Sequence, residues 1–287
     1  MLTLHKDTVL FREAIRYTAA STGFGARLIE KDYYCSVLLH VLAVRTDLPL
    51  VFKGGTCLAK VHAGFYRLSE DMDFLIPVEI DAKRSTKREL ILPVKDAFER
   101  LHTDNSCFDI LQPLEGANQS SQYLGAVGYS SVISNVVETV KLEISMREPL
   151  YEPIHPGAAH TLLRHPGTEA DAVKGFEVPS ISLTEAYAEK FRAALTRPEV
   201  AVRDFYDIDY AMRIGVIDIE RQQFIELVKN KLAVPGNLPA NISTERMDGL
   251  VAQIGTRLRP VLREEDYQSF DVQRAINAVM QVARAVG

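Results

Sequence analysis

Two short stretches decide the fold, Val51-Phe-Lys-Gly-Gly-Thr-Cys-Leu-Ala-Lys60 and Ser69-Glu-Asp-Met-Asp-Phe74. In the first, a short apolar run predicts a strand that stops at the glycine pair Gly54-Gly55, and Thr56 stands where a helix would begin. Glycine lets the backbone turn tightly and approach a ligand without a Cβ in the way. Free N–H groups at the start of a helix bind phosphate well. The first stretch therefore predicts a strand, a glycine turn and a helix, with a possible phosphate site at the turn.

The second stretch carries two carboxylates, Asp71 and Asp73, with Met72 between them. Residues two apart on a strand point to the same side, so both carboxylates would face one way while Met72 and Phe74 face the core. Neighbouring carboxylates repel each other unless a cation lies between them. Mg²⁺ suits such a place, because it binds through a few carboxylates together with phosphate oxygens. Alone, the pair is also typical of a solvated strand end and the glycine pair of an ordinary turn, but together they predict a nucleoside-triphosphate site.

The composition is that of a globular protein. Of the 287 residues, 47% are hydrophobic and 25% are charged, which allows a sizeable core in one large domain or two small ones. The net charge of −5 does not favour nucleic-acid binding, so any such contact would have to come from local basic patches. Three widely spaced cysteines argue against a disulfide framework and a Cys-based zinc site. With no apolar leader and no run of membrane length, we expect a cytoplasmic protein that contacts no membrane.

The remaining periodicities predict helices around a sheet, followed by a helical region. Helices are expected over 11–18 and 28–41, and strands over 48–53, 71–76, 123–133 and 137–146. The segment 148–179 is rich in Pro, Gly and His, which is more typical of turns or short strands than of a metal cluster. From residue 183 onwards the spacing is helical, and we place a soft domain boundary near residue 180.

A polar, strongly basic helix is expected between Ala82 and His102, and Pro93 should kink or split it. The basic residues of this segment are Lys83, Arg84, Lys87, Arg88, Lys95 and Arg100. They form either an ordinary solvated face or a surface that contacts RNA in a salt-sensitive manner.

The strand expected over 137–146 adds a third acidic candidate, Glu143. Its polar positions alternate with apolar ones, so Glu143 would lie on a polar face with Lys141. A neighbouring strand that carries a carboxylate could supply a further metal ligand. The pattern alone is also typical of an exposed cross-strand Lys/Glu pair.

A second group of candidates lies in the helical region. Lys190 follows the helix start at Ser182-Leu-Thr184. Asp204 and Asp207 are three residues apart, so they share one face of the next helix. Lysine is a compact cation that suits triphosphate oxygens. The same residues are also typical of an exposed helix lysine and of carboxylates favoured by a helix dipole.

Lys53-Gly-Gly-Thr-x-Leu-x-Lys60, followed by Arg67-x-Ser-Glu-Asp-x-Asp-Phe74, resembles the AbiEii/AbiGii family of nucleotidyltransferase toxins. This family includes the MenT-type toxins and belongs to the DNA polymerase β-like superfamily. The segments 30–34, 139–145 and 185–209 resemble it in the same order, and nothing recognisable follows about residue 215. Glu30-Lys-Asp-Tyr-Tyr34 is, by physical pattern, a helical charge cluster. Some superfamily members have Gly-Ser where this chain has Gly55-Thr56, but threonine keeps the hydroxyl.

The resemblance implies an α+β fold. It implies a polymerase β-like core, a mixed sheet with flanking helices over residues 1–180, and a mostly helical subdomain over 181–287 that completes the active site. It further implies a toxin with a cognate antitoxin, which transfers nucleotides from an NTP to an RNA acceptor, the 3′ end of tRNA, with Mg²⁺. Two alternatives stay open: a catalytically silent relative that binds nucleotide or a partner protein, and a small-molecule nucleotidyltransferase of the antibiotic-modifying kind.

The resemblance also implies roles for the candidate residues. The metal ligands would be Asp71 and Asp73, with Glu143 completing a second metal site although aspartate is commoner there. The phosphate contacts would come from Gly54, Gly55, Thr56 and Lys190. Asp207, together with Asp204, would orient Lys190 or accept the proton of the attacking hydroxyl. Secondary candidates for phosphate or acceptor contact are Lys53, Lys60 and Arg67.

Overall fold

The computed structural model describes residues 2–287 and divides into two compact units. The first unit runs to Leu150 and continues from Ile154 to Ile181. The second unit consists of Tyr151–Pro153 and Ser182–Gly287. Three residues of the second unit thus lie, along the chain, inside the first.

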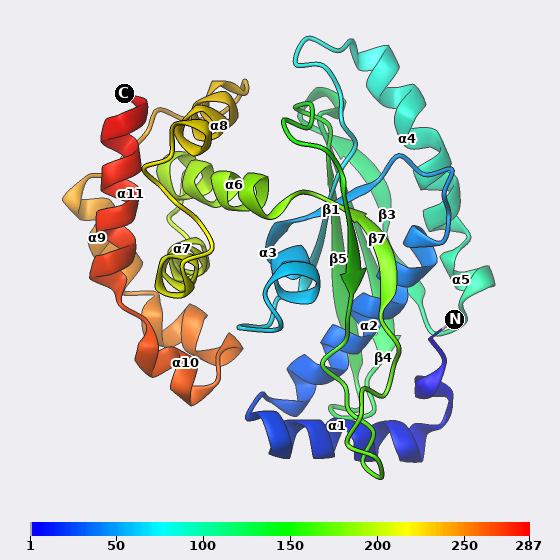
Figure 1. Cartoon of the computed structure of the whole chain (residues 1–287). Coiled ribbons are helices and arrows are strands. Elements are labelled where there is room, and N and C mark those ends of the chain that lie inside the picture. The colour runs from blue at the N-terminus through cyan, green and yellow to red at the C-terminus, as the bar shows by residue number, and fades with distance from the viewer. Residues whose placement is uncertain (1) are drawn as a thin grey trace. The chain divides into compact units, whose positions relative to one another are not determined.

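A mixed sheet forms the centre of the first unit (Figure 1). Its described strands follow the order β3-β4-β5-β2-β1-β7-β6. They are β1 Val51–Lys53, β2 Asp71–Leu75, β3 Asp109–Ala117, β4 Gln122–Ser130, β5 Val137–Ser145, β6 His155–Ala159 and β7 Phe176–Ser180. Strand β2 lies antiparallel to β1 and parallel to β5. The mixed sheet with flanking helices confirms the predicted α+β class, and the two strands of the sequence motif are neighbours near its middle.

Helices flank this sheet. They are α1 Thr8–Thr22, α2 Ala26–Ala43, α3 Gly54–Cys57, α4 Arg84–Glu99 and α5 Leu101–Asp104, and α3 continues into a π-helical turn, η2, over Leu58–His62. Helix α2 lies across the sheet and contacts β2, β5 and β7 (Figure 1). Its Tyr34 stacks on Tyr129 of β4 with ring centroids 3.9 Å apart. Aromatic pairs of this kind add to the stabilisation from buried area, so α2 is firmly attached to the sheet.

Two details differ from the sequence predictions. Strand β3 was not predicted, because it is an edge strand with mostly exposed side chains and carries Pro113 where its register with β4 shifts. Such a segment lacks the alternation that marks a half-buried strand. Of the kink or split expected at Pro93, the split does not occur, because α4 continues through this residue to Glu99. The carbonyl that Pro93 cannot bond belongs to Glu89, an exposed residue, so water can satisfy it.

Short strands occupy part of the segment 148–179, as its turn-rich composition allows. Strand β6 contains Pro156 and Gly157 and pairs only along the edge of the sheet with β7, the place where proline is tolerated in a strand.

The second unit is helical, as predicted from residue 183 onwards. Its described helices are α6 Leu183–Thr196, α7 Val202–Ile214, α8 Gln222–Ala233, α9 Thr244–Val251, α10 Glu264–Ser269 and α11 Val272–Val286. The hydroxyl of Ser182 caps α6 by accepting a hydrogen bond from the Glu185 N–H at 3.0 Å. The fully buried Glu185 carboxylate accepts from the backbone N–H of Tyr151 at 3.2 Å and of Glu152 at 2.9 Å. Across residues 2–287, every helix is too short or too polar to cross a bilayer.

Candidate active site

The two aspartates of the motif lie on one side of β2. Asp71 is exposed and Asp73 is half-buried, while Met72 and Phe74 between and after them are buried, 0% and 2% exposed. Asp73 is level with Lys53 on β1 and with Glu143 on β5. The alternation in the sequence thus becomes a small acidic area on the polar face of the sheet.

Gly54 brings the backbone of the turn against the carboxylate of Asp73. Its φ is +77°, in the left-handed region, and a Cβ built on it would lie 2.1 Å from Asp73 Oδ2. Real Cβ atoms do not approach an oxygen so closely. The position therefore needs glycine for its backbone conformation and for the space that Asp73 fills.

We expect Gly54→Ala to lower activity at least tenfold more than Gly64→Ala. Both residues have a left-handed φ, +77° and +60°, but a Cβ at Gly64 meets no atom within 4 Å. In both variants the left-handed backbone of a non-glycine residue lowers the stability by roughly 1 kcal/mol. Only Gly54→Ala also displaces Asp73. Initial rates of nucleotide transfer, compared with melting temperatures, separate the two effects. Equal losses in both variants would mean that Asp73 does not need its place against the turn.

A buried cation lies under the same turn. A Cβ built on Gly55 would lie 2.5 Å from Nη2 of Arg67. Arg67 is 2% exposed, and its Nη1 donates to the carbonyl of Leu68 at 3.2 Å. The guanidinium therefore approaches the glycine backbone from the protein interior, where it adds positive charge behind the turn.

Thr56 connects the turn to the strand that carries the aspartates. Its hydroxyl is buried and donates a hydrogen bond to the backbone carbonyl of Asp71. The hydroxyl that was predicted to contact phosphate thus uses its hydrogen in a bond within the protein. In this place Thr56 fixes the start of β2 relative to the glycine turn.

The acidic area suits a hard divalent cation, although it is not a complete set of ligands. Asp71, Asp73 and Glu143 offer only oxygen, and Mg²⁺ commonly binds one or two carboxylates plus substrate phosphates. Within residues 2–287, no three His, Cys, Asp or Glu side chains are already gathered around one point. The Glu143 carboxylate instead accepts a hydrogen bond from Nε2 of Gln122 at 2.8 Å. Asp71 and Asp73 therefore suit a Mg²⁺ ion whose other ligands are the phosphates of a bound nucleotide. Glu143 lies beside Asp73 on the neighbouring strand.

The candidates of the second unit form a buried cluster of their own. Nζ of Lys190 lies 2.9 Å from Oδ1 of Asp204 and 2.8 Å from Oδ2 of Asp207. The side chains of the two aspartates are 4% and 0% exposed. Asp204 also lies 3.3 Å from Nη1 of Arg197. The i, i+3 spacing on α7 thus places both carboxylates on the lysine of α6.

Residues 37–277 match the family model of the nucleotidyl transferase AbiEii toxin of type IV toxin–antitoxin systems. The chain belongs to the AbiEii family. The fold is similar to that of MenT4, a nucleotidyltransferase toxin of Mycobacterium tuberculosis H37Rv, with 19% identity, a TM-score of 0.56 and coverage of 95% of this chain and 91% of that one. It is also similar to JHP933 from Helicobacter pylori, with 17% identity, a TM-score of 0.51 and coverage of 92% and 93%. No curated protein sequence matches the chain.

In this AbiEii-family protein, Lys60 has a place that the resemblance did not imply. It is 2% exposed, and its Nζ lies 2.5 Å from Oδ1 of Asp32 and 2.6 Å from Oγ of Ser36. The other carboxylate oxygen of Asp32 accepts from the N–H of Leu162 at 3.1 Å. A buried cation needs such a partner, and Lys60 has one in Asp32 of α2. A contact of Lys60 with phosphate or acceptor stays a prediction from the resemblance.

The charged residues at the start of α2 are buried and each holds a different segment, which the sequence reasoning missed. Lys31 binds Glu70, just before the Asp-x-Asp pair, at 2.8 Å. Glu30 accepts from the N–H of Val132 at 2.7 Å and from the hydroxyl of Ser131, and burial raises the pKa of Glu30. These partners lie 39 and about 100 residues away, so only the high charge in an otherwise apolar helix could have pointed to them.

A second buried cluster in the helical unit was also missed. Nζ of Lys231 on α8 lies 2.7 Å from Glu185 and 3.3 Å from Glu189, both on α6. In the sequence, the lysine of α8 and the glutamates of α6 look like ordinary exposed charges on two helices. The cluster joins α6, which carries Lys190, to α8.

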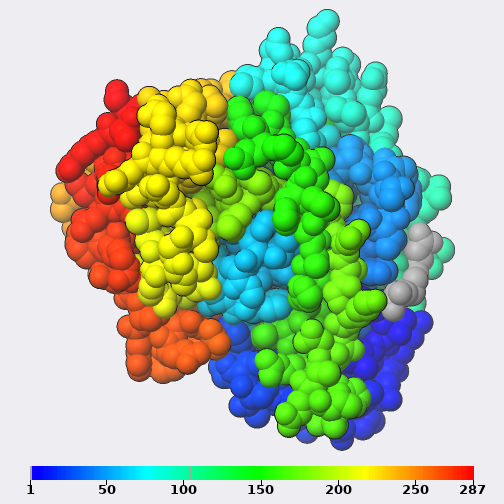
Figure 2. Space-filling view, viewed as in Figure 1, coloured from blue at the N-terminus to red at the C-terminus, as the bar shows by residue number. Residues whose placement is uncertain are grey.

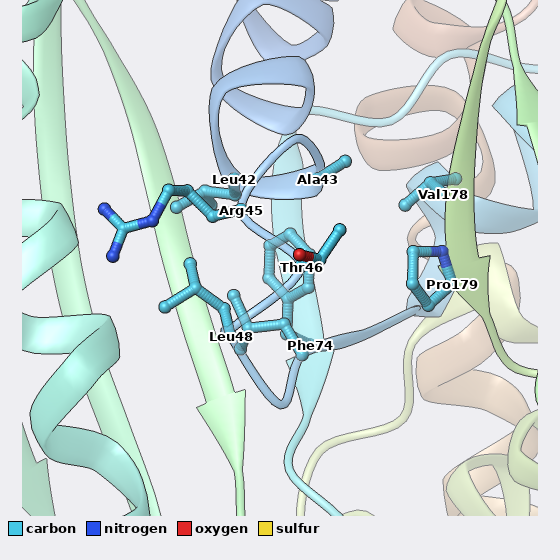
Figure 3. A pocket seen from close by; sticks show the side chains of 9 residues that line it. Leu42, Ala43, Arg45, Thr46, Leu48, Phe74, Val178 and Pro179 are labelled. Carbon is cyan, nitrogen blue, oxygen red and sulfur yellow. The ribbon is translucent and has the colours of Figure 1, made fainter.

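Two pockets of the first unit lie away from the acidic area. One, of about 150 Å³, is lined mainly by apolar side chains such as Leu42, Leu48 and Phe74 (Figure 3). Phe74 follows Asp73 on β2, so it points to the opposite face of the sheet. The other, of about 460 Å³, lies around Leu4 and Phe176. In the space-filling view the segment around α3 and η2, in light blue, reaches the surface beside the green β6 and β7 region (Figure 2). Within the motif, Asp71 is exposed and Gly54 and Asp73 are half-buried, whereas the stretch from Gly55 to Lys60 is buried.

Proposed function

We propose that this AbiEii-family toxin transfers a nucleotide from an NTP to an RNA acceptor in an Mg²⁺-dependent reaction. The observation that carries the proposal is the contact between the left-handed turn at Gly54 and the carboxylate of Asp73, with Asp71 on the same side of the strand. A turn for phosphates and an oxygen-rich area for a cation adjoin each other there. Both are needed for phosphoryl-type transfer, in which the protein supplies mainly position and charge.

Asp71 and Asp73 would hold the cation, and Glu143 is the adjacent carboxylate that can complete the site. When bound, Mg²⁺ neutralises charge on the phosphates and lowers the pKa of the attacking hydroxyl. The backbone of Gly54 and Gly55 lets the triphosphate come close, and Arg67 adds positive charge from behind the turn. A contact of Lys190 with the triphosphate, and a role of Asp207 as proton acceptor, remain predictions from the family resemblance.

A basic surface at the start of α4 supports a polyanionic acceptor. The start of α4 exposes Lys83, Arg84 and Arg88. Nε of Arg84 lies 3.4 Å from Oγ of Ser120, two residues before the Gln122 that binds Glu143. Gln122 is level with Ser145 of β5, which is level with Leu75 at the end of β2, whereas the glycine turn lies towards Asp71 at the start of β2. An RNA backbone bound at the start of α4 would therefore have to extend along β2 for its end to reach the site. The 3′ end of tRNA is the acceptor that the resemblance implies, and a cognate antitoxin is the implied partner.

The test is to incubate the purified protein with each of the four α-phosphate-labelled NTPs, Mg²⁺ and total RNA, with EDTA as the control. We expect label in tRNA, release of pyrophosphate and no reaction with EDTA. Label that stays bound to the protein without pyrophosphate release would favour a silent nucleotide-binding relative. Label that enters small molecules of an RNA-free extract, and not RNA, would favour an antibiotic-modifying type of enzyme.

A further inference from the structure

The Glu143 carboxylate is held by two side-chain amides in series. Nε2 of Gln122 donates to Oε1 of Glu143 at 2.8 Å, and Oε1 of Gln122 accepts from Nδ2 of Asn118 at 2.9 Å. A carboxylate can only accept, so the N–H₂ end of the Gln122 amide must face Glu143. With both ends bonded, the amide has one favourable orientation.

The series begins in a strained turn. Asn118, Gln119 and Ser120 all have a left-handed φ, of 49°, 57° and 64°. Non-glycine residues rarely adopt this conformation, and they persist in it only where the surroundings hold them. Here the carbonyl of Asn118 accepts from the N–H and the hydroxyl of Ser121 at 3.1 and 2.6 Å. Strain of this kind is concentrated at functional sites, where it fixes a side chain in place.

The two hydrogen-bonded amides end at a carboxylate of the acidic area, which indicates what they do. Glu143 is level with Asp73 on the neighbouring strand, and its long side chain would otherwise sample several rotamers. The bond from Gln122 occupies one carboxylate oxygen and fixes the side chain, while the negative charge remains. Hydrogen bonds to a ligating carboxylate commonly orient it and tune its affinity for the metal.

We propose that Gln122 is a positioning residue that holds Glu143 beside Asp73, so that Glu143 completes a divalent-cation site. This rests on the proposed function, because it assumes that the acidic area binds the cation. Gln122 acts through Glu143 and has no contact with the reacting atoms.

The experiment is a calorimetric titration of Mn²⁺ into the protein with a non-hydrolysable NTP analogue. Gln122→Met keeps the side-chain length and removes both amide bonds, so Mn²⁺ should bind about tenfold more weakly, the lower end for lost outer ligand contacts. Asn118→Gly keeps the left-handed backbone and removes one amide, so we expect a smaller loss. Gln112→Met, at an exposed position of β3, should bind Mn²⁺ as the wild type does.

The double variant separates the possible outcomes. In the Glu143→Ala background, Gln122→Met should add no further loss, because the two residues act as a unit. Additive losses, or wild-type binding by Gln122→Met alongside weaker binding by Glu143→Ala, would overturn the positioning role and leave the cation site standing. If neither Asp73→Asn nor Glu143→Ala weakens Mn²⁺ binding, the proposed cation site itself is overturned. Melting curves check that each variant folds.

Discussion

Asp73→Asn should lower the rate of nucleotide transfer by roughly 1,000-fold while the protein keeps its fold. Asparagine has the same shape, so the contact with Gly54 is preserved, but it lacks the charge that holds a cation. Loss of about 4 kcal/mol of transition-state stabilisation, of the size that a metal ion supplies, corresponds to about three powers of ten in rate. Initial rates at saturating Mg²⁺ and NTP measure the effect.

The matched control for this prediction is Asp81→Asn. Asp81 is an exposed carboxylate of the first unit outside the strands, so its loss should change neither the rate nor the melting temperature. Wild-type transfer by Asp73→Asn would show that the carboxylate is not part of the catalytic site. A large fall in melting temperature would instead assign Asp73 a structural role.

Lys60→Met should destabilise the protein by about 3–5 kcal/mol, the usual cost of removing one partner from a buried ion pair. The side chains of Lys60 and Asp32 are 0% and 3% exposed, so the remaining carboxylate cannot be solvated. Urea denaturation gives the free energy of unfolding. Lys174→Met, at an exposed position, should change it by no more than about 0.5 kcal/mol.

The same variant decides between two roles of Lys60. A structural ion pair predicts lower stability with little change in the KM for NTP of the folded protein. A nucleotide ligand, which the family resemblance implies, predicts normal stability and a raised KM. Adding Asp32→Asn should recover part of the loss, because the buried charge without a partner is then also removed.

The local patterns around the motif were sufficient to predict its geometry. The glycine pair after an apolar run gave the turn, and the Asp-Met-Asp alternation placed both carboxylates on one side of β2, because these features depend on neighbours in the chain. The partners of Lys60 and Glu30 could not be predicted in this way, because their contacts span 28 and 101 residues. In a single sequence, a lysine that pairs with a buried aspartate looks like one that awaits a phosphate. The edge strand β3 was missed because little of it is buried.

The short excursion of Tyr151–Pro153 into the helical unit limits how the protein can be dissected. A fragment that begins at Ser182 would lack the two backbone N–H groups that bind the buried Glu185 carboxylate. A fragment that ends at Leu150 would lack β6 and β7, the strands on one margin of the sheet. No single cut therefore yields two intact halves, and we expect each half made separately to be insoluble or poorly folded. During synthesis, too, β6 and β7 emerge only after Tyr151–Pro153, so the sheet is completed after a segment of the helical unit has been made.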